Sequence, residues 1–125
     1  MDGMSPSTER RRSPRTPQQL ALTIKVIYSS TRSVAPGHTF QAHTSDISET
    51  GVQVRLLSEV TTGAELEMWV ISPLQRETLV LNGTVRWCRA SDDDPTLYRA
   101  GIEIARRPTT DFRKWQNMAA GLGGI

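Results

Sequence analysis

Two short stretches of the chain carry side chains suited to binding a phosphorylated ligand with a guanine-like edge. Residues 9–15 read Glu-Arg-Arg-Arg-Ser-Pro-Arg, and residues 46–51 read Asp-Ile-Ser-Glu-Thr-Gly. The guanidinium group of arginine binds phosphate through two parallel hydrogen bonds and stacks on flat rings. Aspartate accepts hydrogen bonds from adjacent N–H groups, serine donates or accepts them, and glycine lets a flat ligand approach the backbone. Together the two stretches predict a site for a guanine nucleotide.

The order and spacing of these stretches resemble the PilZ family of cyclic di-GMP receptors. The family signatures are RxxxR and, some thirty residues later, [D/N]xSxxG; residues 11–15 fit the first and residues 46–51 fit the second. Each signature alone is common, whereas the ordered pair with a strand between the two is specific. The resemblance extends over about residues 9–105 and includes strand-like stretches at 83–87 and 101–103.

The resemblance implies a role for each signature residue. Arg11 and Arg15 are expected to bind the phosphates and to stack on guanine. Asp46 is expected to accept hydrogen bonds from a guanine edge, Ser48 to bond phosphate or base, and Gly51 to permit close approach. The resemblance therefore implies a cyclic di-GMP receptor and adaptor that presents a ligand-dependent surface to a partner protein.

Three further residues are candidates through the same resemblance. In the family, an arginine directly before RxxxR accompanies binding of an intercalated pair of ligands, and Arg10 occupies that place. We therefore expect two cyclic di-GMP molecules per protomer, with Arg10 and Arg12 contacting the second. Trp87 has two interpretations, a core side chain or a ring beside the bound base.

Composition places the basic charge of the protein in its N-terminal segment. The chain has 125 residues, which indicates one domain, and a formal net charge of +2. Residues 1–19 hold four arginines against two acidic residues, which leaves eleven basic and eleven acidic residues in the remainder. A solvated basic tail and a nucleic-acid-binding arm are the alternatives to a ligand arm. We expect no nucleic acid polymer as partner, because the second signature favours a small anionic ligand.

Alternating apolar residues predict a mainly β protein. Every second residue from Leu20 to Tyr28 is expected to face the core, and shorter alternating stretches separated by turns follow. In the stretch from Leu79, Trp87 shares the phase of the apolar residues, and Gly83 is expected to mark a bulge. About six strands are counted, in agreement with the six-stranded antiparallel barrel that the resemblance implies.

The two ends of the chain are expected to differ from the barrel. Proline-rich residues 1–18 are predicted to be a flexible arm, and residues 19–125 a barrel with a terminal helix. The helix is expected to begin near Asp111, to pack Trp115 against the barrel and to end at Gly121.

Other kinds of chemistry find little support in the sequence. There is no phosphate-loop signature, no nucleophile elbow and no convergent set of metal ligands, so neither catalytic residues nor a metal or cofactor is expected. No apolar run approaches the length of a membrane span, and the lone Cys88 cannot form an internal disulfide. A cytoplasmic monomer that is not inserted into a membrane is therefore expected. The alternative function is a protein-interaction barrel that binds no nucleotide.

Overall fold

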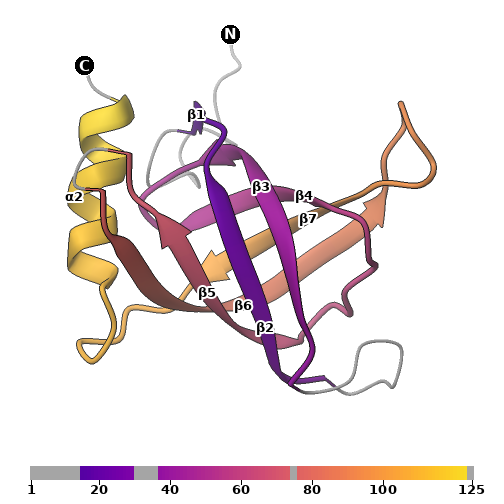
Figure 1. Cartoon of the computed structure of the whole chain (residues 1–125), viewed down its shortest axis with the longest axis horizontal. Coiled ribbons are helices and arrows are strands. Elements are labelled where there is room, and N and C mark those ends of the chain that lie inside the picture. The colour runs from indigo at the N-terminus through magenta and orange to yellow at the C-terminus, as the bar shows by residue number, and fades with distance from the viewer. Residues whose placement is uncertain (1–14, 30–36, 74–75, 124–125) are drawn as a thin grey trace, which may run out of the picture.

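The computed structural model describes residues 15–29, 37–73 and 76–123; residues 1–14, 30–36, 74–75 and 124–125 lie outside this description. The described residues form strands and one C-terminal helix (Figure 1). The elements are β1 (Thr16–Pro17), β2 (Ala21–Tyr28), β3 (Thr39–Ile47), β4 (Gly51–Leu56), β5 (Glu65–Ile71), β6 (Thr78–Ala90), β7 (Tyr98–Ile104) and α2 (Phe112–Gly123).

The strands close into an antiparallel barrel. The order is β3-β2-β5-β6-β7-β4, and pairing of β3 with β4 joins the two ends. The short strand β1 adds to the edge of β3 beyond the region that pairs with β2. The prediction of a mainly β, six-stranded antiparallel barrel with a C-terminal helix is confirmed, with β1 as an additional strand.

One face of each strand fills the barrel, because successive side chains of a strand point to opposite faces. Leu22, Ile24 and Val26 of β2 are buried, as the alternation predicts. Tyr28, however, is 57% exposed, so the prediction that it faces the core is wrong. The pairing of β2 with β5 shifts register between Val26 and Tyr28, and this irregularity ends the alternation.

Helix α2 lies beside one end of the barrel, whereas the β6–β7 hairpin projects from the opposite end (Figure 1). The helix buries Trp115 and Met118, and the carboxylate of Asp111, directly before the helix, accepts a 2.8 Å hydrogen bond from the backbone N–H of Val80 in β6. The prediction that Gly121 ends the helix is wrong, since α2 continues to Gly123. Within the described residues, no helix is long and apolar enough to cross a membrane.

Two bulges change the direction of side chains, one in β3 and one in β6. One lies in β3 between Thr44 and Asp46, and the other lies in β6 between Val85 and Trp87. The second bulge is not at Gly83, where the sequence led us to expect one. Gly83 instead faces the core, where an added Cβ would lie 2.6 Å from the side chain of Ile102. A bulge inserts one residue and re-aims the side chains that follow it, which matters for the site described next.

Candidate functional site

Strand β1 brings the ends of the two signature stretches together. Thr16 pairs with Ile47, and Pro17 pairs with Asp46. Continuing this antiparallel register by one residue sets Arg15 opposite Ser48. Arg15 is exposed and Asp46 is half-buried, so a ligand can reach both from outside the barrel.

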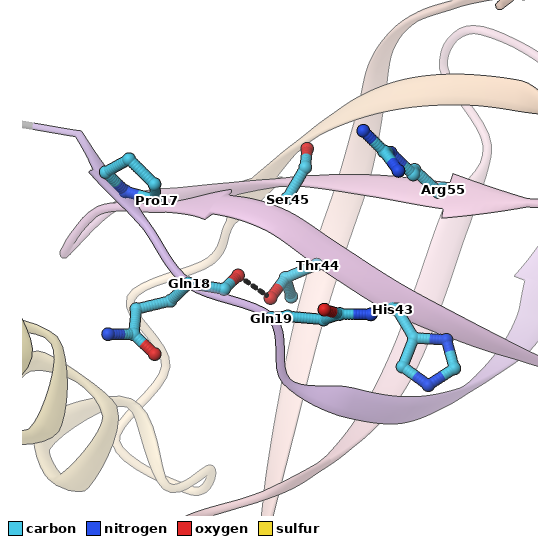
Figure 2. A pocket seen from close by; sticks show the side chains of 7 residues that line it. All are labelled: Pro17, Gln18, Gln19, His43, Thr44, Ser45 and Arg55. Carbon is cyan, nitrogen blue, oxygen red and sulfur yellow. Dashed lines mark hydrogen bonds between the residues drawn. The ribbon is translucent and has the colours of Figure 1, made fainter.

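A buried threonine holds this junction in place. Thr44 is 2% exposed; its hydroxyl accepts a 2.8 Å hydrogen bond from the Leu20 N–H and donates a 2.5 Å bond to the Gln18 carbonyl (Figure 2). The backbone N–H of Gln18 also donates to the Ser45 carbonyl at 3.2 Å. These bonds fix where the chain that follows Arg15 meets β3.

The second signature is partly strand and partly tight turn. Asp46 belongs to β3 and Gly51 to β4, so the turn occupies only residues 48–50. Ser48 is buried, with 7% of the residue exposed. Its hydroxyl donates a hydrogen bond to the Gly51 carbonyl at 3.3 Å and accepts one from the Thr50 N–H at 3.3 Å. Ser48 therefore shapes the turn through its own side chain.

Gly51 is required by the packing of the barrel. A Cβ added at Gly51 would lie 3.0 Å from the backbone carbonyl oxygen of Ile102 in β7. A backbone atom in a paired strand cannot easily move aside, so any larger residue would strain the β4–β7 pairing. The close approach at this glycine is thus between two strands of the protein.

An outward-facing row of residues extends from Asp46 across three further strands. Asp46 pairs with Gln53 in β4, Gln53 pairs with Gly101 in β7, and Gly101 pairs with Trp87 in β6. We call these four residues the outer row. Neighbouring strands lie about 4.8 Å apart, so Asp46 and Trp87 are separated by roughly 14 Å along the barrel wall.

Trp87 faces outward, and the prediction that it shares the phase of the core residues is wrong. The bulge between Val85 and Trp87 shifts every later residue of β6 by one position, so Trp87 pairs with Gly101 on the outer face. The indole lies on the glycine, since an added Cβ at Gly101 would be 2.2 Å from Nε1 of Trp87. The guanidinium carbon of Arg89 lies 4.8 Å from the centre of the ring, a cation–π contact. Trp87 is therefore a half-buried residue of the outer face.

Three arginines beside the outer row were missed by sequence reasoning. Arg55, Arg99 and Arg89 occupy adjacent strands, and Arg99 pairs with both of the others. The Arg99 guanidinium donates a 3.1 Å hydrogen bond to the side-chain oxygen of Gln53, a member of the outer row. The balanced charge of the barrel sequence concealed this cluster, because a net charge does not show where charges gather. The strand phase of these residues, corrected for the bulge, would have been the signal.

A surface depression of about 380 Å³ lies between the chain exit at Pro17 and the side chain of Arg55. Its lining residues come from β1, the segment that follows it, β3 and β4 (Figure 2): Pro17, Gln18, Gln19, His43, Thr44, Ser45 and Arg55. In Figure 2 the side chains of Ser45 and Arg55 project to the same side of the wall.

The C-terminal helix contacts the back of the signature turn. The indole N–H of Trp115 donates a 2.9 Å hydrogen bond to the carbonyl of Ser48. Gln116, the next residue of the helix, donates to the carboxylate of Glu49 at 3.4 Å. The prediction that Trp115 packs the helix against the barrel is confirmed, and the indole additionally holds the turn.

The structure thus brings Arg15, Asp46, Ser48 and Gly51 to one place and sets Trp87 at the far end of the outer row. The remaining predicted site residues, Arg10, Arg11 and Arg12, lie outside the described residues. In the part of the chain that the structure describes, no three His, Cys, Asp or Glu side chains converge as metal ligands.

Comparison with solved structures shows the same fold in two longer proteins. The chain is similar to the Bacillus subtilis inhibitor of motility MotI/DgrA, with a TM-score of 0.69 and 17% identity over 90% of this chain and 49% of that chain. It is also similar to MrkH, described as a novel c-di-GMP-dependent transcription regulatory factor, with a TM-score of 0.55 and 14% identity over 90% of this chain and 51% of that chain. The chain spans about half the length of each of these proteins.

Comparison of the sequence itself gives the family. No curated protein sequence matches the chain significantly. Residues 9–120 match the PilZ domain, a range that includes both signature stretches, the whole barrel and most of α2. This match extends over nearly all of the 125 residues, and the closed barrel agrees with it. The chain belongs to the PilZ domain family.

Proposed function

We propose that the chain is a non-catalytic receptor for cyclic di-GMP. The observation that supports this most directly is the β1–β3 pairing, which sets Pro17 against Asp46 and so joins the two signature stretches. The outer row extends the site by about 14 Å to Trp87. A carboxylate for a guanine edge, an exposed guanidinium for phosphate and an indole for a base then lie on one surface.

Each signature residue has a proposed role in binding. Arg11 and Arg15 bind phosphate and stack on guanine, and Asp46 accepts from the guanine N–H groups. Ser48 holds the turn and keeps one hydroxyl lone pair for a ligand donor, since a hydroxyl can accept two hydrogen bonds. Gly51 permits close approach of the ligand and also keeps the strand next to the turn close to β7. Each charge-assisted contact contributes about 1.5–3 kcal/mol.

The ligand is proposed to bind as an intercalated pair, two molecules per protomer. Arg10 and Arg12 would contact the second molecule, and Trp87 would stack beside one of the bases. The protein would act as a monomer. Titration calorimetry that yields one ligand per chain would contradict the pair and leave the receptor role intact.

The signal is proposed to pass to a partner protein in the cytoplasm. The part of the predicted arm, residues 1–18, that precedes β1 would fold over the ligand bound on the barrel of residues 19–125 and create a new surface. The structural neighbours, an inhibitor of motility and a c-di-GMP-dependent transcription regulatory factor, support a regulatory role of this general kind.

The deciding experiment is isothermal titration of the protein with cyclic di-GMP. We expect micromolar or tighter binding that Arg15→Ala weakens by about tenfold or more. Arg113→Ala, which removes an exposed arginine from α2, should bind as the wild type does. Displacement of bound, labelled cyclic di-GMP by unlabelled cyclic di-GMP but not by GTP would exclude a general nucleotide or nucleic-acid site.

The second candidate function is a protein-interaction barrel without a nucleotide. No binding of cyclic di-GMP by the wild-type chain would favour this role. The signature residues would then serve the structure of the junction between β1 and β3.

A further inference from the structure

We infer that Arg55, Arg99 and Arg89 form a second anion-binding subsite, which receives phosphate groups of a cyclic dinucleotide bound at the outer row. We call these three residues the arginine row. The inference rests on the proposed function, and it goes beyond the two signatures, because none of the three residues belongs to either.

The strand register places the three arginine residues side by side on adjacent strands. Arg55 of β4 pairs with Arg99 of β7, and Arg99 pairs with Arg89 of β6. Their strand neighbours Val54, Leu56 and Ala100 are buried, so the three arginines face outward. Arg55 and Arg89 are exposed, and Arg99 is half-buried between them.

This arrangement is unfavourable for the protein alone. Like charges directly opposite each other on adjacent strands destabilise a sheet. The two ion pairs among the described residues, Arg86–Glu103 and Lys114–Glu77, do not involve the arginine row. The Nε atom of Arg99 is buried and has no hydrogen-bond partner. A locally unfavourable charge cluster indicates a functional role, and an anion is the partner that relieves it.

The arginine row lies within reach of the proposed ligand. It is displaced by two residues along each strand from the outer row, a distance of about 6.6 Å. The hydrogen bond from Arg99 to Gln53 directs one guanidinium toward the outer row. The contact of Arg89 with the Trp87 ring places a second one beside the proposed base site.

The depression beside Arg55 gives the subsite a shape. It reaches from Arg55 past His43 and Ser45 to Pro17, and Pro17 pairs with Asp46 (Figure 2). A ligand held at Asp46 therefore has an open depression beside it, with the guanidinium-bearing Arg55 in its lining. The three arginines span only three adjacent strands, a size that suits the phosphates of a compact dinucleotide. A polymer would need a longer charged groove with several exposed aromatic residues.

The test compares four variants by titration calorimetry with cyclic di-GMP at two salt concentrations. They are Arg55→Gln, Arg89→Gln, Arg15→Ala and the control Arg113→Gln on α2. We expect Arg55→Gln and Arg89→Gln each to weaken binding by about tenfold and to reduce the salt dependence, whereas Arg113→Gln changes the affinity by less than about twofold.

A second readout separates this role from a merely structural one. Arg55→Gln relieves repulsion, so the melting temperature without ligand should rise by about 2 °C. The additional rise on adding cyclic di-GMP should be smaller than in the wild type.

The outcomes distinguish the two proposals. If Arg15→Ala abolishes binding but Arg55→Gln and Arg89→Gln bind like Arg113→Gln, the second subsite is disproved and the receptor role stands. If the wild type does not bind cyclic di-GMP, both proposals fail. If Arg55→Gln and Arg89→Gln lose affinity for a single-stranded oligonucleotide and keep it for cyclic di-GMP, the arginine row serves a polymer and the inference is wrong.

Discussion

The indole N–H of Trp115 donates a 2.9 Å hydrogen bond to the backbone carbonyl of Ser48, so the C-terminal helix holds the turn of the second signature. Trp115 has no exposed surface, and Ser48, its hydrogen-bond partner, is also buried. The hydroxyl of Ser48 therefore supports the turn from within, and the indole supports it from the helix.

Replacing Trp115 with phenylalanine tests this support. The variant keeps an aromatic side chain but leaves the buried Ser48 carbonyl without its donor, which costs about 1–3 kcal/mol. We expect a lower midpoint in urea unfolding and weaker binding of cyclic di-GMP. Trp69→Phe is the matched control, because Trp69 lies on the outer, half-exposed face of β5. Equal midpoints for the two variants would contradict a supporting role of the indole.

Thr44→Val tests the anchor of the chain exit. The variant has nearly the same shape but removes a hydroxyl that bonds both the Leu20 N–H and the Gln18 carbonyl. We expect a loss of about 1–3 kcal/mol in the free energy of unfolding and a weaker affinity for cyclic di-GMP, because Arg15 is no longer positioned. Thr23→Val, on the outer face of β2, should change neither quantity appreciably. An unchanged affinity in Thr44→Val would show that the hydrogen bonds of Thr44 are not needed to position Arg15 for ligand binding.

Gly101→Ala tests the seat of the tryptophan. The added Cβ would lie 2.2 Å from Nε1 of Trp87, so the ring must swing away from the strand. We expect the emission of Trp87 to shift to longer wavelength and the affinity for cyclic di-GMP to fall, at a stability cost of about 1 kcal/mol. Gly51→Ala should leave the emission of Trp87 unchanged and cost more stability, because its Cβ meets the backbone of Ile102 at 3.0 Å. Unchanged emission in Gly101→Ala would show that the indole does not rest there.

The half-buried thiol of Cys88 should make the stability of the protein depend on pH, whether or not ligand is bound. Burial of its thiol, with a smaller contribution from the charge of Glu59, raises the pKa above the ordinary value, although a hydrogen bond at Val60 partly lowers it. Alkylation by iodoacetamide at pH 8 should therefore be slower in the native protein than in urea. A raised pKa in the folded state contributes stability that is lost as pH rises through that value, so Cys88→Ser should reduce the alkaline loss of stability. Equal alkylation rates in the two states would rule out the protected thiol.

The sequence predicted the parts of the fold that follow from simple alternation. The buried faces of β2, β4 and β5 have the period of two expected for half-buried strands, and the buried face of α2 has helical spacing. The sequence did not predict where that period breaks. Tyr28 and Trp87 share the sequence phase of the core residues but face outward, and a register irregularity precedes each.

The sequence predicted those parts of the candidate site that lie in one contiguous motif. It did not predict the parts that strand pairing brings together from distant positions. The second signature is contiguous, so its turn could be placed from the sequence, and β1 then brings Arg15 beside it. The arginine row is spread over three strands and more than thirty residues of sequence, with no local signal. The Ser48 hydroxyl was expected to bond phosphate or base, and in the structure it also bonds its own turn.

The pairing of β1 with β3 has a consequence for the strength of ligand capture. Thr16, directly after Arg15, is paired with β3, and four residues of extended chain, the spacing from Arg11 to Arg15, span at most about 14 Å. For the proposed site, the first signature would thus act at an effective concentration in the millimolar range or above, whatever the dilution of the protein. A synthetic peptide of residues 1–15 added to a barrel that lacks them would have to be supplied at that concentration to restore the same affinity.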